Sequence, residues 1–339
     1  MQAEAVNVQL LVREASIRAR QGRFHDTLSL SLQVVERAEA VGERRVVALA
    51  YTLIDEALLF LGRTSEATHF ALALEIAEKL GDRPLIGAAL RNLGVVAYFE
   101  GRWNDAVSFF RRGADVAFGS GDIGGAAISE MNVGEILGNQ GRLDEANADL
   151  RRATRTFQGL GYATLEVAAI TQLGRVAAEL GSDAEALELL TRAVDSDDSA
   201  GSPLAGMEAR GFLAEAHVLA GRASEALEVV ASARARVGSA LDKTPAGVLL
   251  ERVEASALAA MGEHAGLIER IDHALLGARA AGTYFDLAVL LVLRSSLEGG
   301  TQPPELVEER DKLLDQLGII AVPALGHLPS EDRSIEPSR

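Results

Sequence analysis

The chain has 339 residues, 48% apolar and 4% aromatic, and its formal net charge of −16 leaves no basic face for phosphate, so we expect no nucleic-acid partner. Because it has no cysteine, a disulfide framework and a thiolate zinc site are excluded. The N-terminus lacks a basic segment followed by an apolar one, and no run approaches the roughly 18 apolar residues of a membrane span, so we expect a cytoplasmic protein without membrane contact.

A short pattern, glycine and arginine followed by an acid and an alanine, recurs along the chain. Clear copies are LGRTSEA (61–67), EGRWNDA (100–106), QGRLDEA (140–146), LGSDAEA (180–186) and AGRASEA (220–226), and weaker ones are QGRFHDT (21–27) and MGEHAGL (261–267). The leading glycines are Gly22, Gly62, Gly101, Gly141, Gly181, Gly221 and Gly262, at intervals of 39 to 41 residues. A fixed period of this size predicts a solenoid, in which each unit buries its apolar face against its neighbours.

Each repeat consists of two predicted helices. A second glycine follows the first by about half a period in most units, at Gly42, Gly81, Gly121, Gly161, Gly201 and Gly282. Between such glycines the apolar residues fall on one helical stripe, as in 143–157, where they recur every three or four residues. Glycine suits the left-handed residue that ends a helix. The repeat is therefore an αα-hairpin, and the predicted fold is an all-α, right-handed superhelical solenoid of antiparallel hairpins.

The two ends depart from the pattern. The first helix carries apolar residues on every side (Val6, Val8, Leu10, Leu11, Val12 and Ile17), so we expect an upstream domain or a second copy to cover it. At the other end, residues 299–318 keep only a second helix. We therefore assign 1–318 to a repeat domain of about seven hairpins plus a terminal helix, and 319–339 to a tail that is partly disordered. Within that tail, IIAVPAL is expected to pack on the last helix.

The stretch FGSGDIGG (118–125) has the G-x-G-x-x-G spacing of a dinucleotide-binding loop. That motif is informative only after a strand and within a βαβ unit. The residues before it have helical character, and Gly121 is the second glycine of a repeat, so we interpret the stretch as a turn between repeats.

The repeats resemble the tetratricopeptide repeats (TPR). In LRNLGVVAYFEGRWNDAVSFFRRG (90–113), Leu93 and Gly94 lie in the first helix, Gly101 at the turn, and Ala106 and Phe110 in the second. NVGEILGNQGRLDEA and QLGRVAAELGSDAEA repeat these offsets, with small residues that let paired helices approach closely, Gly94 against Ala106 and Gly134 against Ala146. The period near 40 resembles the longer repeats in C-terminal regions of bacterial multidomain signalling regulators, including ATPase-type regulators and nucleotide cyclases.

The chain shows no pattern typical of a catalytic or metal site. Its six histidines form neither H-E-x-x-H nor any i, i+4 pair, and it has no G-x-S-x-G. We therefore predict no catalytic residue, metal or cofactor. The arginines that follow the turn glycines, at 23, 63, 102, 142 and 222, each precede an acid by three residues, and we expect ion pairs between repeats.

The resemblance implies that the first helix of each repeat lines a concave groove. Carried over by offset from the turn glycine, the candidate groove residues are Glu56, Phe60, Arg91, Val95, Tyr98, Phe99, Ile128, Met131, Glu135, Asn139 and Arg175. The repeats around Gly181 and Gly221 offer Thr171, Arg175, Glu179, Glu208 and Glu215, an acidic stretch. The apolar members indicate a partner site, and the alternative is that longer helices bury them against neighbouring repeats.

We therefore expect a non-catalytic scaffold that binds a protein or peptide in its groove. The resemblance implies the C-terminal sensory or regulatory region of a bacterial signalling protein. The alternative is a stand-alone adaptor or small-ligand receptor, and a homodimer or an upstream domain is expected through the N-terminal helix.

Overall fold

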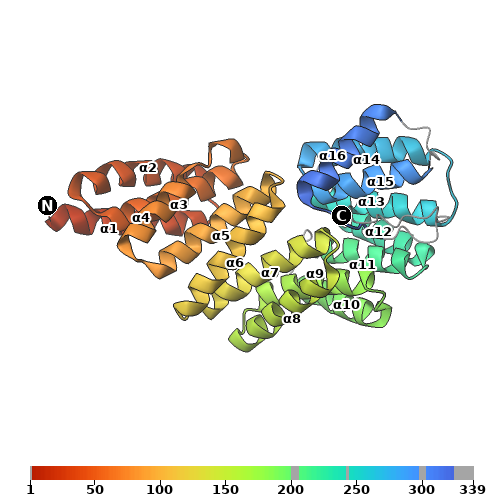
Figure 1. Cartoon of the computed structure of the whole chain (residues 1–339), viewed down its shortest axis with the longest axis horizontal. Helices are drawn as coiled ribbons and strands as arrows, with labels where there is room; N and C mark the ends of the chain where they lie inside the picture. Colours follow the sequence, from red (N-terminus) through yellow and green to blue (C-terminus); the bar gives the residue numbers. More distant parts are fainter. Residues whose placement is uncertain (1, 200–205, 242–243, 298–302, 324–339) are drawn as a thin grey trace, which may run out of the picture. The chain divides into compact units, whose positions relative to one another are not determined.

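The computed structural model describes residues 2–199, 206–241, 244–297 and 303–323, and this part of the chain is built from helices and turns (Figure 1). The helices are α1 (Gln2–Arg20), α2 (Phe24–Val41), α3 (Arg44–Phe60), η1 (Thr64–Glu66), α4 (His69–Leu80), α5 (Arg83–Phe99), α6 (Trp103–Gly119), α7 (Ile123–Asn139), α8 (Leu143–Leu160), α9 (Ala163–Glu179), α10 (Asp183–Ser199), α11 (Met207–Leu219), α12 (Ala223–Val237), η2 (Gly238–Leu241), α13 (Pro245–Ala260), α14 (Leu267–Ala281), α15 (Tyr284–Leu297) and α16 (Pro304–Leu317). Among the described residues, no helix has the length and apolar character needed to cross a bilayer.

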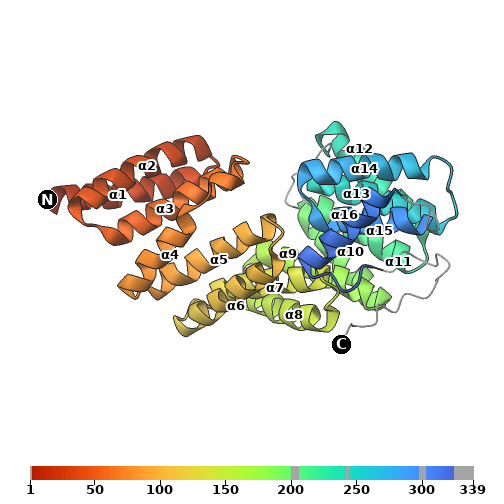
Figure 2. The same cartoon turned by 45° about the horizontal axis from the view of Figure 1, so that its top comes forward.

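The chain divides into two compact units, unit 1 (Met1–Val133) and unit 2 (Gly134–Arg339), and the boundary falls inside α7. Within each unit, consecutive helices pack as αα-hairpins, which lie side by side in both views (Figures 1 and 2). The first helices of successive hairpins also pack on one another, α1 on α3 and α3 on α5 in unit 1, and α9 on α11, α13 and α15 in sequence in unit 2. We call this row of first helices the first-helix layer of its unit.

The last hairpin has a first helix that the sequence did not predict. α15 packs on α14 and α16, so the described chain continues the array by one more pair. The helix YFDLAVLLVLRSSL is buried on almost all sides, from Phe285 to Leu291 without interruption. A helix buried all round shows no one-sided apolar stripe, and it therefore escapes a search for amphipathic periodicity.

The repeating glycines take the left-handed conformation that the hairpin requires. At the turns within hairpins, φ lies between +70° and +81° at Gly22, Gly62, Gly101, Gly141, Gly181, Gly221 and Gly262. Gly121, with φ +80°, joins α6 to α7, and the backbone N–H of Asp122 donates to the carbonyl of Ala117 in α6. FGSGDIGG is therefore a turn between two helices, and the interpretation against a nucleotide loop is confirmed.

Glycine also permits close helix packing inside the hairpins, and the predicted approach of Gly134 to Ala146 is present, since a Cβ at Gly134 would lie 3.3 Å from the Ala146 carbonyl oxygen. The nearest side chain is nevertheless another residue of the second helix. A Cβ at Gly94 would lie 2.7 Å from the Phe110 ring, one at Gly134 would lie 2.6 Å from Leu150 Cγ, and one at Gly174 would lie 2.7 Å from Leu190 Cγ. These partners lie one turn beyond the alanines Ala106, Ala146 and Ala186. The small alanine side chain lets the two helices approach closely, and the next apolar side chain of the second helix packs against the glycine.

The second hairpin of unit 1 is irregular. Where the other second helices of unit 1, α2 and α6, begin directly after the turn, the chain forms η1 and then α4, which begins at His69. Asp55 of α3 is fully buried and accepts hydrogen bonds from the backbone N–H of Phe70 (2.7 Å) and of His69, and from the His69 ring at 2.7 Å. Burial raises the pKa of Asp55, and these hydrogen bonds act in the opposite direction. Asp55 thus caps α4 from a neighbouring helix.

The arginines after the turn glycines do not connect repeats as predicted. Instead, four of the five pair with the acid three residues later in the same turn: Arg23 with Asp26, Arg63 with Glu66, Arg102 with Asp105 and Arg142 with Glu145. Of these eight residues Arg142 is half-buried and the others are solvent-exposed. At the start of a second helix, the acid lies in the first turn and the arginine just before it, so the i, i+3 partner is closer than any side chain of the next repeat.

Only one side of the first helix, α1, packs in the core of unit 1. Val8 and Val12 are buried in the core of unit 1 with Val34 and Ala38 of α2. Val6, Leu10 and Ile17 are exposed on the opposite side of α1.

We expect Gly174→Ala to destabilise unit 2 by about 1 to 3 kcal/mol, because the new methyl group overlaps Leu190. The matched control is Gly159→Ala in α8, where a Cβ meets nothing within 4 Å. This control should be neutral or stabilising by up to about 1 kcal/mol, because alanine is the better helix former. Urea unfolding of both variants checks the contrast, and equal effects would mean that the contact with Leu190 does not require a glycine at position 174.

Candidate functional site

The predicted groove residues of unit 1 lie on α3, α5 and α7 with different exposures. Glu56, Arg91, Val95, Tyr98, Ile128 and Met131 are half-buried, and Phe60 and Phe99 are exposed. Phe60 stacks on Phe24 with ring centroids 4.3 Å apart. Tyr98 stacks on the buried Trp103 at 5.8 Å and contacts Phe99 edge-on. Tyr98 therefore supports packing within its hairpin, whereas Phe60 and Phe99 offer free ring faces.

Two charged groups are sheltered among these residues. Burial raises the pKa of the Glu56 carboxyl. Burial also lowers the pKa of the Arg91 guanidinium, and Asp122, whose carboxylate lies 3.9 Å from Arg91 Nη1, acts in the opposite direction. Arg91 therefore has an acidic neighbour within its own unit.

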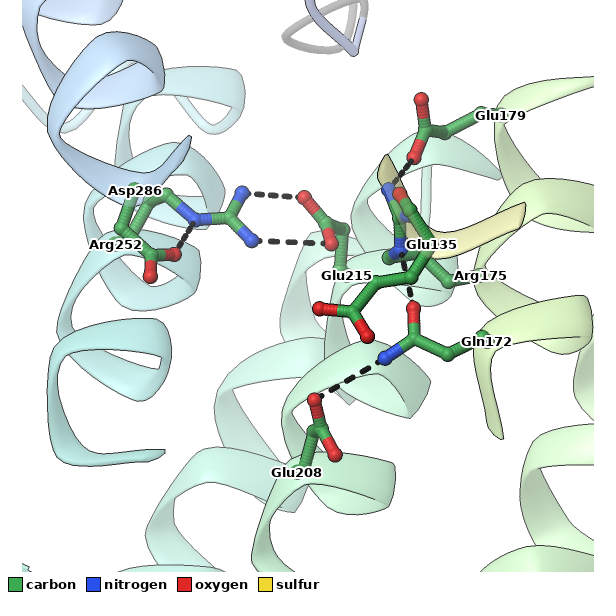
Figure 3. A network of polar contacts seen from close by, with 8 residues as sticks. All are labelled: Glu135, Gln172, Arg175, Glu179, Glu208, Glu215, Arg252 and Asp286. Carbon is green, nitrogen blue, oxygen red and sulfur yellow. Dashed lines mark hydrogen bonds and ion pairs between the residues drawn. The ribbon is translucent and has the colours of Figure 1, made fainter. Parts of the chain in front are cut away.

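In unit 2 a connected set of polar side chains lies on the first-helix layer (Figure 3). We call it the polar cluster, and its members are Glu135 (α7), Gln172, Arg175 and Glu179 (α9), Glu208 and Glu215 (α11), Arg252 (α13) and Asp286 (α15). It includes two predicted groove residues, Glu135, which is half-buried, and Arg175, which is buried. Asn139, the remaining predicted residue, is buried at the end of α7.

Arg175 is the centre of the α9 half of the cluster. Its guanidinium donates to Glu179 Oε1 at 2.7 Å, to Gln172 Oε1 at 3.2 Å and to the backbone carbonyl of Glu135 at 3.4 Å. The Gln172 amide in turn donates to Glu208 Oε1 at 3.2 Å. Only 1% of the Arg175 side chain is exposed, so these acceptors replace its hydration.

Arg252 is the centre of the other half. Its guanidinium forms a two-pronged contact with Glu215, in which Nη1 meets Oε1 and Nη2 donates to Oε2 at 3.1 Å, and its Nε donates to Asp286 at 2.7 Å. The Arg252 side chain is 1% exposed. This planar fork is the geometry for which arginine is better suited than lysine.

Two aromatic rings join the halves. The Arg175 guanidinium carbon lies 5.5 Å from the centroids of both Phe212 and Phe285, and that of Arg252 lies 5.5 Å from Phe285. Phe285 of α15 therefore contacts a cation from α9 and another from α13.

Carboxylates outnumber cations in the polar cluster. Five carboxyl groups accompany two guanidiniums (Figure 3). Desolvation raises the pKa of Glu179 to about 7, against the attraction of Arg175, and desolvation with the repulsion of Glu135 raises the pKa of Glu208 to about 7. Glu208 is nevertheless exposed, so it is a carboxylate that protein surrounds without closing off from water.

Sequence reasoning found much of this cluster. The spacing from the turn glycine predicts Glu179, Glu208 and Glu215 as an acidic stretch of the first helices. Arg252 lies ten residues before Gly262, the same spacing that separates the predicted Thr171 from Gly181. Applying this spacing to the repeat around Gly262 therefore predicts Arg252 as well. Asp286 lies in the last hairpin, whose sequence lacks the recurring pattern of glycine, arginine, acid and alanine, and Gln172 lies nine residues before Gly181, a spacing that none of the predicted residues has, so neither was predicted.

The cluster has no metal-binding character. Among the described residues, no group of three histidine or acidic side chains could hold a metal ion. Arg175 and Arg252 instead occupy the positions between the carboxylates where a cation would lie.

Comparison with known proteins defines the class. No protein-family description and no curated protein matches the sequence. A Rap protein solved in complex with competence and sporulation factor matches with a TM-score of 0.70 at 12% identity, over 93% of this chain and 88% of that one. NprR in complex with its cognate peptide NprX gives 0.66 at 12% identity, over 90% and 89%. A signal transduction ATPase from Pyrococcus horikoshii with a tetratricopeptide repeat sensor gives 0.60 at 16% identity, over 86% of this chain and 44% of that one.

At these identities the likeness concerns the fold. The chain is an all-α solenoid of αα-hairpins of the TPR-like class. The fold predicted from the glycine period and the small-residue offsets is therefore confirmed.

We expect Arg252→Met to destabilise unit 2 by about 3 to 5 kcal/mol, because Glu215 and Asp286 then remain buried without a cation. Removing all three charges, by adding Glu215→Leu and Asp286→Leu, should recover much of this loss. The control Arg142→Met breaks an exposed pair and should cost less than about 1 kcal/mol. Urea unfolding measures all three, and a small loss in Arg252→Met would show that water reaches the carboxylates.

Stability should also depend on pH through Glu179. Its folded-state pKa is about 7 and its ordinary value 4.5, so the folded chain retains a proton that the unfolded chain releases between these values. The free energy of unfolding therefore falls as pH rises from about 4.5 to about 7, by about 1 to 3 kcal/mol from this group. Glu179→Gln should flatten the dependence of Tm on pH in this window, and Glu145→Gln, at an exposed site, should not. A parallel curve for Glu179→Gln would contradict the assignment.

Proposed function

We propose that the chain is a non-catalytic regulatory scaffold that binds a peptide, or a peptide segment of a protein, on the first-helix layer of unit 2. The observation that carries the proposal is the polar cluster, in which side chains from five first helices converge on one place (Figure 3). Proteins of the same fold, matched over about nine tenths of this chain, have been solved in complex with competence and sporulation factor or with a cognate peptide, which supports this ligand class.

The charges of the cluster favour a ligand with a positive group. Arg252 is fully engaged by Glu215 and Asp286, and Arg175 by Glu179 and its amide and carbonyl acceptors. Glu208 accepts one hydrogen bond from the neutral Gln172 amide and faces the like charge of Glu135. An amine or guanidinium placed at Glu208 would balance these carboxylates.

The same comparison supports a signalling context. The ATPase regulator carries its repeats as a sensor within a longer chain, and the match covers 44% of it. We infer that this chain is the sensory or regulatory region of a bacterial signalling protein. A stand-alone adaptor or a small-ligand receptor is the alternative.

A second candidate surface lies on unit 1 and includes Glu56, Phe60, Arg91, Val95, Tyr98, Phe99, Ile128 and Met131. The observation in its favour is the exposure of two aromatic rings, 65% for Phe60 and 55% for Phe99. Such rings anchor protein partners when an apolar partner covers them.

The proposed contact through the N-terminal helix, with a second copy or an upstream domain, uses Val6, Leu10 and Ile17. These side chains are exposed, whereas Val8 is part of the core. Leu10→Glu with Ile17→Glu should therefore abolish self-association of the chain in sedimentation at high concentration without unfolding it. A wild-type chain that sediments as a monomer would contradict a homodimer.

Selection from a random peptide library, followed by calorimetry on the enriched peptides, tests the main proposal. We expect peptides with a basic residue to be enriched, and Glu208→Gln to weaken their binding at least about 10-fold, because a charge-assisted hydrogen bond is lost. Glu188→Gln on the outer helix α10 removes an equal charge at an exposed site and should have no effect. Phe99→Ala distinguishes binding on the unit 1 surface from binding on unit 2. Peptides that lose affinity only with Phe99→Ala would transfer the site to unit 1, and a library without any enriched peptide would contradict peptide binding.

A further inference from the structure

Unit 2 makes contacts that skip repeats. In an open solenoid each repeat touches only its neighbours. Here Arg175 of α9 contacts Phe285 of α15, three hairpins further along the chain. The turn after α7 also contacts the residues after α16. We call these two sets of contacts together the seam, because they join the beginning of unit 2 to its end.

Gln140 makes the outer part of the seam. Its side-chain amide donates to the carbonyl of Leu317, 177 residues away, at 2.8 Å, and its backbone carbonyl accepts from the N–H of Ile320 at 2.9 Å. Gln140 is 2% exposed. Residues 317–323 thus contact the turn between α7 and α8. The sequence predicts that IIAVPAL packs on the last helix, and it does not predict this contact with an earlier turn. Residues 324–339 of the predicted tail lie outside the described residues.

Gly141 fits this contact sterically. A Cβ on it would lie 2.9 Å from the Cβ of Ala321, whereas at the equivalent glycines Gly181, Gly221 and Gly262 a Cβ meets nothing within 4 Å. The turn glycine is therefore used twice here, for its positive φ and for the close approach of another segment.

The seam lies beside the polar cluster. Arg175 belongs to both, and Gln140 follows Glu135 by little more than one helical turn. With the seam closed, Glu179, Glu215 and Asp286 are almost fully enclosed, and solvent meets the cluster at the exposed Glu208 and the half-buried Glu135. A ligand that contacts the cluster beyond Glu208 needs the two sides of the seam to separate.

We infer that residues 317–323 form a releasable latch, and that its release from Gln140 and Gly141 opens the first-helix layer of unit 2 to the ligand. This inference rests on the proposed function for the identity of what enters, and on the seam contacts for the opening itself. The latch is weak enough to be reversible. Each net hydrogen bond shifts an equilibrium by about 2- to 12-fold. Ile320 and Ala321, which lie at Gln140 and Gly141, are exposed, whereas Leu317 and Pro323 at the ends of the segment are buried, so release concerns the middle of the segment. Releasing it also separates Phe285 from Arg175, while Arg252 keeps its bonds to Glu215 and Asp286.

Carboxyl footprinting tests the latch without any ligand. The full chain is treated with a water-soluble carbodiimide and glycinamide, which convert accessible carboxyl groups to amides, and mass spectrometry gives the rate at each residue. In Gln140→Ala, which removes one latch hydrogen bond, we expect the rates at Glu179 and Asp286 to rise about 2- to 12-fold. Gln158→Ala, at an exposed glutamine of α8, is the matched control and should leave them unchanged.

Internal residues separate opening from unfolding. Glu208 is exposed with the seam closed and should react similarly in all variants, and Asp149, buried in α8 away from the seam, should stay protected. Unchanged rates at Glu179 and Asp286 in a folded Gln140→Ala chain would overturn the latch. A rise that includes Asp149 to the same degree would mean global unfolding and would also count against it.

A reversible lock gives a second test. Because the chain has no cysteine, Gly141→Cys with Ala321→Cys introduces the only thiols, and the added Cβ at position 141 would lie 2.9 Å from the Cβ of Ala321, closer than the roughly 3.8 Å of a disulfide. A side chain at the positive φ of Gly141 is strained, so the reduced variant should itself open more than the wild-type chain. When oxidised, this variant should show lower rates at Glu179 and Asp286 than after reduction, and Gly141→Cys alone should not respond to reductant. Equal rates in both redox states would overturn the latch. Peptide binding can fail while these rates behave as expected, so the two proposals fail separately.

Discussion

Unit 2 depends on the requirement that a buried guanidinium be fully paired. Arg175 and Arg252 are each 1% exposed, and an unpaired charge at that depth would cost several kcal/mol. Their acceptors come from α7, α9, α11 and α15, so the pairing fixes how far apart the first helices lie. Apolar contacts join neighbouring hairpins as well, in one core that runs from α9 to α13, but such contacts are non-directional, whereas a two-pronged arginine contact requires one relative position of its partners. The ion pairs thus specify the spacing of the layer more than they contribute to stability.

The fold was readable from the sequence because its determinants are local. A glycine at a helix end must adopt a positive φ, and a glycine facing a neighbouring helix must lack a Cβ, so Gly141 and Gly134 report the turn and the packing with no knowledge of the rest of the chain. The prediction for the arginines after the turns was wrong because their interactions are local as well. Their partners are three residues away, and the regular recurrence of the pattern suggested a longer-range role that it does not have.

The candidate site was only partly readable because it is made by contacts between repeats. The spacing from the turn glycine selects side chains on one side of a first helix, and three of those it selects, Glu135, Arg175 and Glu215, lie in the polar cluster. This spacing does not predict the ion pair between Arg252 and Asp286, because Asp286 lies in the last hairpin, whose sequence lacks the recurring pattern of glycine, arginine, acid and alanine. Nor could Gln140 be recognised as a contact for Leu317, since hydrogen bonds between a glutamine amide and a distant carbonyl leave no pattern in the sequence.

The seam also limits how this protein can have evolved. Open solenoids gain and lose whole repeats readily, because each new unit needs only a neighbour on either side. In unit 2 the residues after α16 must reach the turn after α7, and Phe285 must reach Arg175. Duplicating or deleting one period of about 40 residues between them would shift one partner past the other and break both contacts. The number of repeats in this half of the chain is therefore fixed by its closure, and divergence is restricted to substitutions within a constant length.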